Sequence, residues 1–444
     1  MIGRLVLVCL VLAGSAHIAD AQTTVQATSP TLAEMLQNVY GPHGLVVDSE
    51  AVLPDGSTHS AHFNGAFQSE FGRVNIALVQ QLGALPIPSP ASGFTYSFDS
   101  STGTFVRSTQ SFGPILADRA ETIGRGRFAF GMGLQQFSFG TFDGLRLSHI
   151  PAVFTHDDFD LGGGRSDVIT TDNTISASVT QTTVSLTYGA TEHLDLSIGV
   201  PLVNTSLSIV SNATIHRLGT ESNPAIHFFR DPDAPGTYGN ERTFVSQGSA
   251  SGLGDVIVRG KETLFKKAHG GLAVGVEARL PTGDEENLLG SGALGVKVFS
   301  AASGTYGHVS PHVNVGYQWN GSSLLAGDIA AGVKGDLPNE LSYVFGADVG
   351  VERRLSIAFD VLGRYWSNAQ RLSSSTFTVS SVSPPQTFDD VAFRVGALNV
   401  VSGSFGLKAN IAGTLLATFN LEFKLNDAGL RTKVTPLVGL EYSF

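Results

Sequence analysis

The chain has 444 residues, a formal net charge of −11 and only 15% charged residues. The negative balance argues against a nucleic-acid partner, because such binding depends on Lys and Arg that neutralise phosphates. The 52 Gly and the low charge depart from an average soluble domain, which has about 7% Gly and about 25% charged residues. No segment beyond the amino terminus is apolar over the roughly 20 residues that a membrane-spanning helix needs. Such a composition suits strands that have one apolar face.

Residues 1–21 have the three-part layout of a secretory signal peptide, with a basic start, an apolar run over 5–13 and an Ala19-Asp20-Ala21 cleavage site. We therefore expect cleavage after Ala21. Cys9 is the only Cys and lies inside the apolar run, which excludes a lipoprotein signal. The mature chain then has no Cys for a disulfide, a zinc site or a nucleophile.

Residues 22–124 lack the alternation of strands and are predicted to form a separate amino-terminal segment. Ser29 as N-cap and Pro30 at the first helical position predict a helix to about Tyr40. A second helix is predicted from apolar residues at helical spacing, which end before three prolines: Phe67, Phe71, Val74, Leu78 and Leu82, before Pro86, Pro88 and Pro90. We expect this segment to plug the lumen of a β-barrel formed by residues 125–444. A periplasmic extension that never enters the lumen is the alternative.

From residue 125 onward, apolar and polar residues alternate with period 2, which is typical of strands with one apolar face. About twelve strands are predicted, near 125–142, 174–189, 193–206, 253–266, 271–282, 289–302, 306–319, 340–350, 354–366, 391–410, 413–426 and 431–444. An extra hairpin near 94–112 would raise the number to fourteen. Pro311 and Pro436 count mildly against their strands, because proline cannot donate a ladder hydrogen bond.

The last strand has the most specific pattern. One face carries apolar residues up to the carboxy terminus: Val434, Pro436, Val438, Leu440, Tyr442 and Phe444. A strand of about 9–11 residues spans a membrane when tilted. A terminal Phe preceded by alternating apolar residues resembles the bacterial signal for outer-membrane targeting and assembly. We therefore expect the barrel assembly machinery to recognise the strand that ends at Phe444.

Two all-β architectures bury one apolar face per strand. A soluble sandwich packs these faces together, whereas a transmembrane antiparallel β-barrel turns them to lipid. The signal peptide, Phe444 and the order of the connections favour a barrel over 125–444 in the bacterial outer membrane, with a Cys-free secreted sandwich as the alternative. Short connections are predicted at the periplasmic end and long outer ones near 143–173, 207–252, 320–339 and 367–390.

Charged residues on the polar faces are predicted to line the lumen, because Arg or Lys facing lipid at mid-depth costs about 2–4 kcal/mol each. Together with two His, the candidates are Arg259, Lys261, Glu277, Arg279, Lys297, His308, His312, Asp348, Asp360, Arg364, Glu422, Lys424 and Glu441. Ion pairs that brace the wall or seat a plug are the favoured interpretation. Lining of a solute path is the alternative.

His308 and His312 lie on one predicted face about 13 Å apart along the strand, which is too far to share one metal. Ser310 lies between them, but side chains two residues apart are about 6–7 Å apart, beyond the hydrogen-bond reach that a nucleophile and its base need. We therefore expect no enzyme, metal or cofactor, with an outer-membrane hydrolase as the alternative. Acidic residues at 156–160 and 284–286 lack the spacing of a calcium loop, so solvated turns are favoured over calcium bridging to lipopolysaccharide.

Three motifs carry a resemblance to a known group: Ser111–Ile115 with Arg119–Gly126, Gly252–Val256 and Arg279–Gly290. With the last strand, they resemble the bacterial outer-membrane family labelled for the MetA pathway of phenol degradation. That family is similar to the FadL-type transporters of long-chain fatty acids and aromatic hydrocarbons. The resemblance covers roughly 94–444 and is strongest at 252–290 and 400–444.

The resemblance implies a plugged barrel that takes up small hydrophobic compounds, aromatic or fatty-acid-like, and lets them leave sideways through its wall. The expected partners are such a solute, outer-membrane lipid and lipopolysaccharide. No match to the ligand-contacting residues of the FadL type is present, so no binding residue is carried over. A structural or adhesion barrel that binds partners through long outer loops is a further alternative.

Overall fold

A computed structural model describes residues 31–41, 43–52, 61–65, 72–83, 96–99, 104–107, 111–157, 159–231, 233–267, 269–329 and 331–444. The predicted signal peptide, Ser29, Pro30 and the start of the second predicted helix lie outside these residues. No helix within the described ranges is long and apolar enough to span a membrane.

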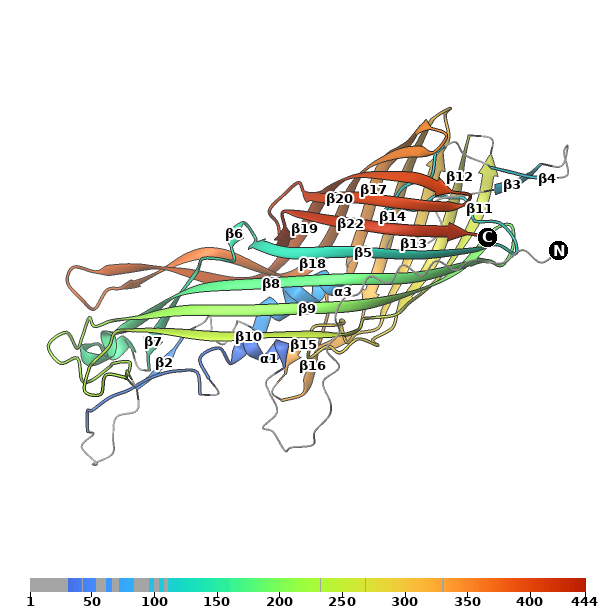
Figure 1. The fold of residues 1–444 in the computed structure, drawn as a ribbon. Coiled ribbons are helices and arrows are strands. Elements are labelled where there is room, and N and C mark those ends of the chain that lie inside the picture. The colour runs from blue at the N-terminus through green and yellow to red at the C-terminus, as the bar shows by residue number, and fades with distance from the viewer. Residues whose placement is uncertain are drawn as a thin grey trace, which may run out of the picture. The chain divides into compact units, whose positions relative to one another are not determined.

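The predicted transmembrane β-barrel is confirmed, with twelve antiparallel strands (Figure 1). In chain order they are β5 (Phe128–Phe142), β8 (Val168–Gly189), β9 (Leu194–His216), β10 (Glu241–Leu253) continued by β11 (Ile257–Lys267), β12 (Gly270–Arg279), β13 (Gly295–Gly304), β14 (Val309–Asn320), β17 (Glu340–Glu352), β18 (Leu355–Val379), β19 (Gln386–Ala412), β20 (Leu415–Lys424) and β22 (Val434–Ser443). Pairing of β22 with β5, from Leu437 opposite Gln135 to Ser443 opposite Ala129, closes the barrel. We call the end that holds Phe128 and Phe444 the inner end and the opposite end the outer end.

Shorter elements accompany the barrel. The strands β1 (Leu45–Val47), β2 (Ala61–Asn64), β6 (Leu145–Arg146), β7 (Ile150–His156) and β21 (Leu430–Thr432) join the same sheet, whereas β3 (Tyr96–Asp99) with β4 (Thr104–Arg107) and β15 (Ser322–Asp328) with β16 (Val333–Asp336) form separate hairpins. The helices are α1 (Leu32–Gln37) and α3 (Gly72–Gly83), with 3-10 turns at Phe159–Leu161 and Gly163–Ser166. Because β3 and β4 pair only with each other, the fourteen-strand alternative does not occur.

The helix α1 begins at Leu32, two residues later than the sequence pattern predicts. Thr31 is its N-cap, and Glu34 completes a capping box by accepting a 2.9 Å hydrogen bond from the Thr31 amide. This reciprocal pair satisfies two amides that the first turn leaves without partners.

Pro436, which counts against the last predicted strand, marks the end of a strand pairing. The ladder between β22 and β5 stops at Leu437, next to Pro436.

Five strands run further outward than predicted, so much of the predicted outer loops is strand. In β9, the apolar outward residues Leu196, Ile198 and Leu202 are exposed in the inner half. In the outer half of β9 the apolar residues stand at odd positions instead of even ones. Leu207 and Ile209 therefore face inward and are buried inside the barrel. We call the zone of exposed, outward apolar residues in the inner half the lipid-facing belt. The alternation continues outward past this zone, with polar residues outside and apolar residues inside. A pattern that keeps period 2 but changes face still satisfies a strand, which is why these segments do not form loops.

Candidate functional site

A belt of chain, residues 111–123, crosses the inner half of the lumen and is held by side chains of the wall. The Phe112 amide donates to Ser356 Oγ at 2.8 Å, and the Ile123 amide lies 3.2 Å from both carboxylate oxygens of Asp195. Lys261 Nζ donates to the carbonyl of Glu121 at 2.7 Å. Since the wall side chains satisfy the belt's backbone groups, the belt is fixed along its length.

One buried ion-pair cluster anchors the start of this belt. Arg119 Nη2 lies 2.5 Å from Asp348 Oδ2, and Ser111 donates to the same carboxylate. His312 lies between two carboxylates, with Nδ1 3.5 Å from Asp348 and Nε2 2.6 Å from Asp360. Because both ring nitrogens of His312 face carboxylates, this ring is not placed as a base for Ser310. The cluster brings together three predicted lumen residues and holds the belt to β14, β17 and β18.

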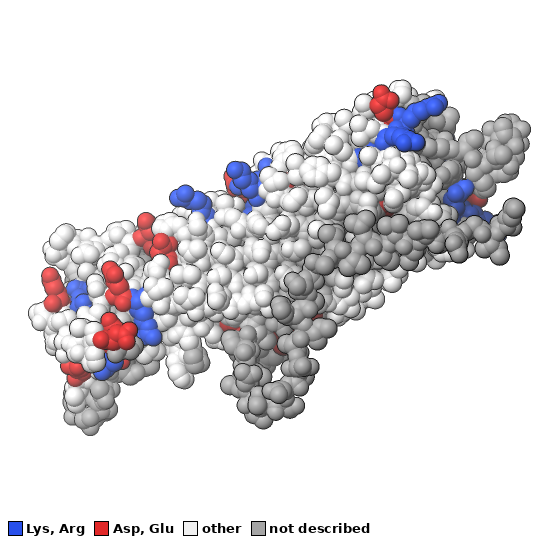
Figure 2. Space-filling view, in the orientation of Figure 1, with Lys and Arg blue, Asp and Glu red and all other residues white. Residues whose placement is uncertain are grey.

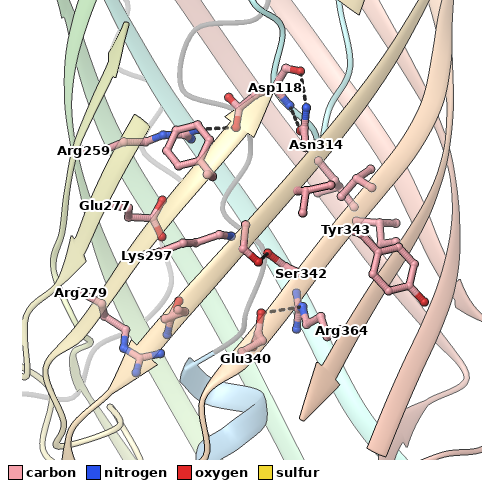
Figure 3. Close-up of a pocket in the computed structure, with 18 of the residues that line it drawn as sticks. Asp118, Arg259, Glu277, Arg279, Lys297, Asn314, Glu340, Ser342, Tyr343 and Arg364 are labelled. Carbon is pink, nitrogen blue, oxygen red and sulfur yellow. Dashed lines mark hydrogen bonds and ion pairs between the residues drawn. The ribbon is translucent and has the colours of Figure 1, made fainter. Parts of the chain in front are cut away.

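A cavity of about 140 Å³ lies beside the belt (Figure 3). Seven charged side chains line it, from the belt and from β11, β12, β13, β17 and β18: Asp118, Arg259, Glu277, Arg279, Lys297, Glu340 and Arg364. Apolar side chains share the lining, among them Leu116, Phe299 and Leu362. The cavity is therefore amphipathic, and it contains five of the predicted lumen residues.

Most of the charges around the cavity are paired. Arg259 contacts Asp118 and lies over the Phe299 ring, with 4.1 Å from its guanidinium carbon to the ring centroid. Arg364 Nε lies 4.0 Å from Glu340. Lys297 and Glu277 face each other across β12 and β13, but neither makes an ion pair within 4.0 Å to another described residue. These ion pairs join the residue 111–123 segment to β11 and β17 to β18.

The wall strand that begins as β10 is interrupted at residues 254–256 before it continues as β11. Asp255 is buried there and accepts from the amides of Gly283 at 3.1 Å and Ser291 at 2.8 Å. Arg279 Nε lies 3.7 Å from the same carboxylate. Asp255 thus fastens the 280–294 loop over the interruption, and two motifs of the family resemblance meet at this point.

The amino-terminal residues pack against the apolar interior of the outer half. Leu32, Met35 and Leu36 of α1 are buried in one cluster with Leu207 and Ile209 of β9. Gly248 of β10 allows this approach, since a Cβ there would lie 2.9 Å from Leu32 Cδ2. The outer half is therefore filled by apolar side chains, in contrast to the charged inner half.

Tyr40 supplies the polar contacts of this outer cluster. Its hydroxyl donates to Asn173 Oδ1 at 3.0 Å and lies 3.0 Å from Ser211 Oγ. Burial raises the pKa of Tyr40, so the hydroxyl stays neutral at ordinary pH. The Ala33 amide also donates to the Glu286 carbonyl at 2.9 Å, which links α1 to the 280–294 loop.

The remaining predicted lumen residues lie elsewhere. Glu422 and Lys424 line a second, smaller cavity of about 40 Å³ beside Arg431. Glu441 pairs with Lys408 at 3.7 Å. His308 is exposed in the turn between β13 and β14, and its Nδ1 lies 3.0 Å from the Gly350 carbonyl.

The predicted acidic outer groups take part in ordinary contacts. Glu285 Oε1 lies 2.8 Å from Lys334 Nζ, and Glu285 Oε2 accepts from the Leu324 amide at 2.8 Å. Among the described residues, no group of three or more His, Cys, Asp or Glu is arranged to hold a metal ion.

Sequence reasoning missed Asp118, Arg119 and Asp255 as site residues, although all three lie in or beside the quoted motifs. They stand outside alternating strands, and the argument from lipid exposure applies only to residues on strands. The presence of charged residues in or beside those motifs was the feature of the sequence that could have identified them.

No protein-family model matches the chain, and no curated protein does either. Several solved structures are similar. An outer membrane channel from Pseudomonas putida F1 has a TM-score of 0.44 and 12% identity, covering 73% of this chain and 98% of that one. A Pseudomonas aeruginosa FadL homologue has a TM-score of 0.30 and 9% identity, with 72% and 90% covered.

The Ralstonia pickettii toluene transporter TbuX has a TM-score of 0.25 and 13% identity, with 72% of this chain and 90% of that one covered. At these identities and TM-scores, the fold assignment depends on the strand pairing of this chain itself.

Proposed function

We propose that this protein is an outer-membrane channel for passive uptake of small hydrophobic compounds. The observation that carries the proposal is the apolar interior of the outer half, where Leu207, Ile209 and Phe137 face inward. A channel for hydrophilic solutes has no use for such a lining, because water and polar solutes gain nothing from apolar contacts. An apolar solute gains about 25 cal/mol for each Å² that it buries there.

In this proposal the amino-terminal segment gates the channel. Leu32, Met35 and Leu36 occupy the apolar interior, so a solute has to share or displace their contacts. Contacts of this kind are non-directional, so an apolar solute can replace them without leaving polar groups unsatisfied. The belt at 111–123 would close the inner half, since its backbone is tied to the wall.

The exit we propose is sideways, at the interruption between β10 and β11. Leu202 and Leu253 mark the outer edge of the lipid-facing belt beside it, and both are exposed. Gly252 and Gly254 have no side chains, and Leu289 of the 280–294 loop packs against them. An apolar solute that leaves here avoids the charged inner half and needs no energy source beyond its own gradient.

The test is uptake of N-phenylnaphthylamine, a neutral hydrophobic fluorophore, into cells that express the full chain. Ile209→Asn makes the outer interior polar, and we expect uptake to fall at least threefold. Ser208→Asn is the matched control, because Ser208 is next in the chain and faces outward. Heat-modified mobility on gels checks that both variants fold as barrels. Equal uptake by both folded variants would overturn the proposal.

A further inference from the structure

The outer half of the barrel presents an unusual surface on the strands β5, β8, β9 and β10. Cross-strand pairing arranges its outward residues in three rows: Gln136, Thr180, Asn204 and Ser251; Ser138, Ser178, Ser206 and Ser249; and Ser176, Ser208 and Gln247. All eleven are Ser, Thr, Asn or Gln, and we call this surface the hydroxyl face.

The hydroxyl face contains no charged residue. A water-facing protein surface usually has about 25–35% charged residues, which keep strands soluble and separate. In Figure 2, blue and red gather near the ends of β8 and β9, and the visible surface between them is white. The first outward carboxylate above the rows is Asp172, which pairs with His149 at 2.8 Å. The charges thus begin only beyond the hydroxyl face.

The side chains of the hydroxyl face are available for contacts. Asn204 donates to Ser251, and the structure gives the other nine no hydrogen bond to a described side chain. Most are exposed. Behind them the sheet packs on buried Val179, Leu207 and Ile209, so the face is a rigid platform.

The position of the hydroxyl face relative to lipid identifies its neighbour. The next row toward the inner end carries Leu134, Thr182, Leu202 and Leu253. Its three Leu are 42%, 52% and 41% exposed and belong to the lipid-facing belt. From Thr180 to Ser176 the rows extend for about 13 Å along the strand. In an outer membrane, the layer directly above the hydrocarbon is the saccharide of lipopolysaccharide.

We propose that the hydroxyl face binds the saccharide of lipopolysaccharide in the surrounding outer leaflet. Hydroxyl and amide side chains both donate and accept, as sugar hydroxyls do. The absence of carboxylates avoids repulsion from sugar phosphates, and the absence of Lys and Arg directs recognition to neutral hydroxyls. The inference depends on the membrane location of the barrel and not on the transported solute.

The test compares binding of two lipopolysaccharides to the purified full-length barrel in detergent, measured by native mass spectrometry. One carries a complete core saccharide and the other is truncated to lipid A with its innermost sugars. We expect the wild type to retain the complete form at least fivefold better. Equal retention of both would overturn the proposal, as would a complete loss of binding on adding EDTA, which would assign the contact to metal-bridged phosphates.

A matched pair of variants locates the contact. Ser178→Glu with Ser249→Glu places two carboxylates in the middle row, on the strands that flank β9. Thr243→Glu is the control, because Thr243 and Asp172 flank Asn212 of β9 in a row beyond the hydroxyl face, where the variant creates the same arrangement of two carboxylates. We expect the middle-row variant to lose at least fivefold in binding of the complete form and the control to match the wild type. Heat-modified mobility confirms folding, and unchanged binding by the folded middle-row variant would refute the proposal.

Discussion

In the inner half of the barrel, charged and polar wall side chains hold a belt of chain, whereas in the outer half apolar wall side chains pack against helix α1. The inner contacts are directional: Arg119 with Asp348 and Lys261 with Glu121 fix particular atoms. The outer contacts of Leu36 and Ile209 depend only on buried area. The comparison teaches that one barrel can combine a fixed seal with a replaceable apolar filling.

The largest expected effect concerns the inner seal. Arg119→Ala leaves Asp348 buried without its strongest partner, which typically costs about 3–5 kcal/mol. We expect the belt to detach and ion conductance in planar bilayers to rise at least fivefold. The control is Arg119→Met with Asp348→Asn, which removes both charges and should leak less than the single variant. If Arg119→Ala leaves the conductance unchanged, the belt does not seal the lumen.

The next effect concerns the proposed exit. A Cβ on Gly254 would lie 2.8 Å from Val203 Cγ2 and 3.0 Å from Pro201 Cγ, so Gly254→Val crowds the strand interruption. We expect uptake of the hydrophobic fluorophore to fall about threefold while conductance stays unchanged. Gly260→Val is the control, since the nearest atom to its Cβ is Leu196 Cδ2 at 3.7 Å. Normal uptake by Gly254→Val would place the exit elsewhere.

A smaller effect is expected where the loop is fastened over that exit. Asp255→Ala leaves the amides of Gly283 and Ser291 without their acceptor, at about 1–3 kcal/mol for each unsatisfied group. Hydrogen exchange over 280–294 should speed up about tenfold or more. Asp284→Ala is the control, because the Asp284 side chain accepts hydrogen bonds from Asn287 of its own turn. Equal hydrogen exchange over 280–294 in both variants would show that Asp255 does not fasten this loop.

The smallest effect lies at the outer end, where Asp167 accepts from Gly219 at 2.7 Å and from His227 Nδ1 at 2.6 Å. Burial raises the pKa of Asp167, but hydrogen bonds from His227, Thr220 and Gly219 together lower it below the usual 3.8. The folded carboxylate therefore contributes stability above about pH 4 that is lost as pH falls through its lowered pKa.

We expect Asp167→Ala to speed amide exchange at Gly219 and Thr220 about tenfold at pH 7, because hydrogen bonds to charged groups contribute about 1.5–3 kcal/mol. Asp172→Ala is the control, since the Asp172 pair with His149 is about half exposed and such pairs contribute little. An Asp167→Ala variant that exchanges like the control would contradict this account.

Much of the fold could be predicted because strand alternation is local. Leu194 to Leu202 shows its apolar face in the sequence, and the aromatic end at Phe444 identifies the closing strand. The reversal in the outer half was also readable, as a change of parity between Leu202 and Val203. It was missed because a membrane strand is expected to end where the lipid-facing pattern ends.

The candidate site was less predictable. Arg259 and Arg364 were assigned to the lumen from the cost of exposing charge to lipid, but their partners Asp118 and Glu340 were not among the candidates. Which residues pair depends on the register of distant strands and on the path of the belt. Neither is encoded in local spacing.

By itself the sequence determined a barrel of about twelve strands and the apolar face of each strand over its lipid-facing part, because a strand's two faces follow from residue parity alone. Only the tertiary structure decided what covers each face. Leu202 and Ile209 are both apolar residues of β9, yet Leu202 is exposed on the lipid-facing belt and Ile209 is buried in one cluster with α1 side chains. The hydrophobic effect removes both from water without specifying whether lipid or protein replaces it.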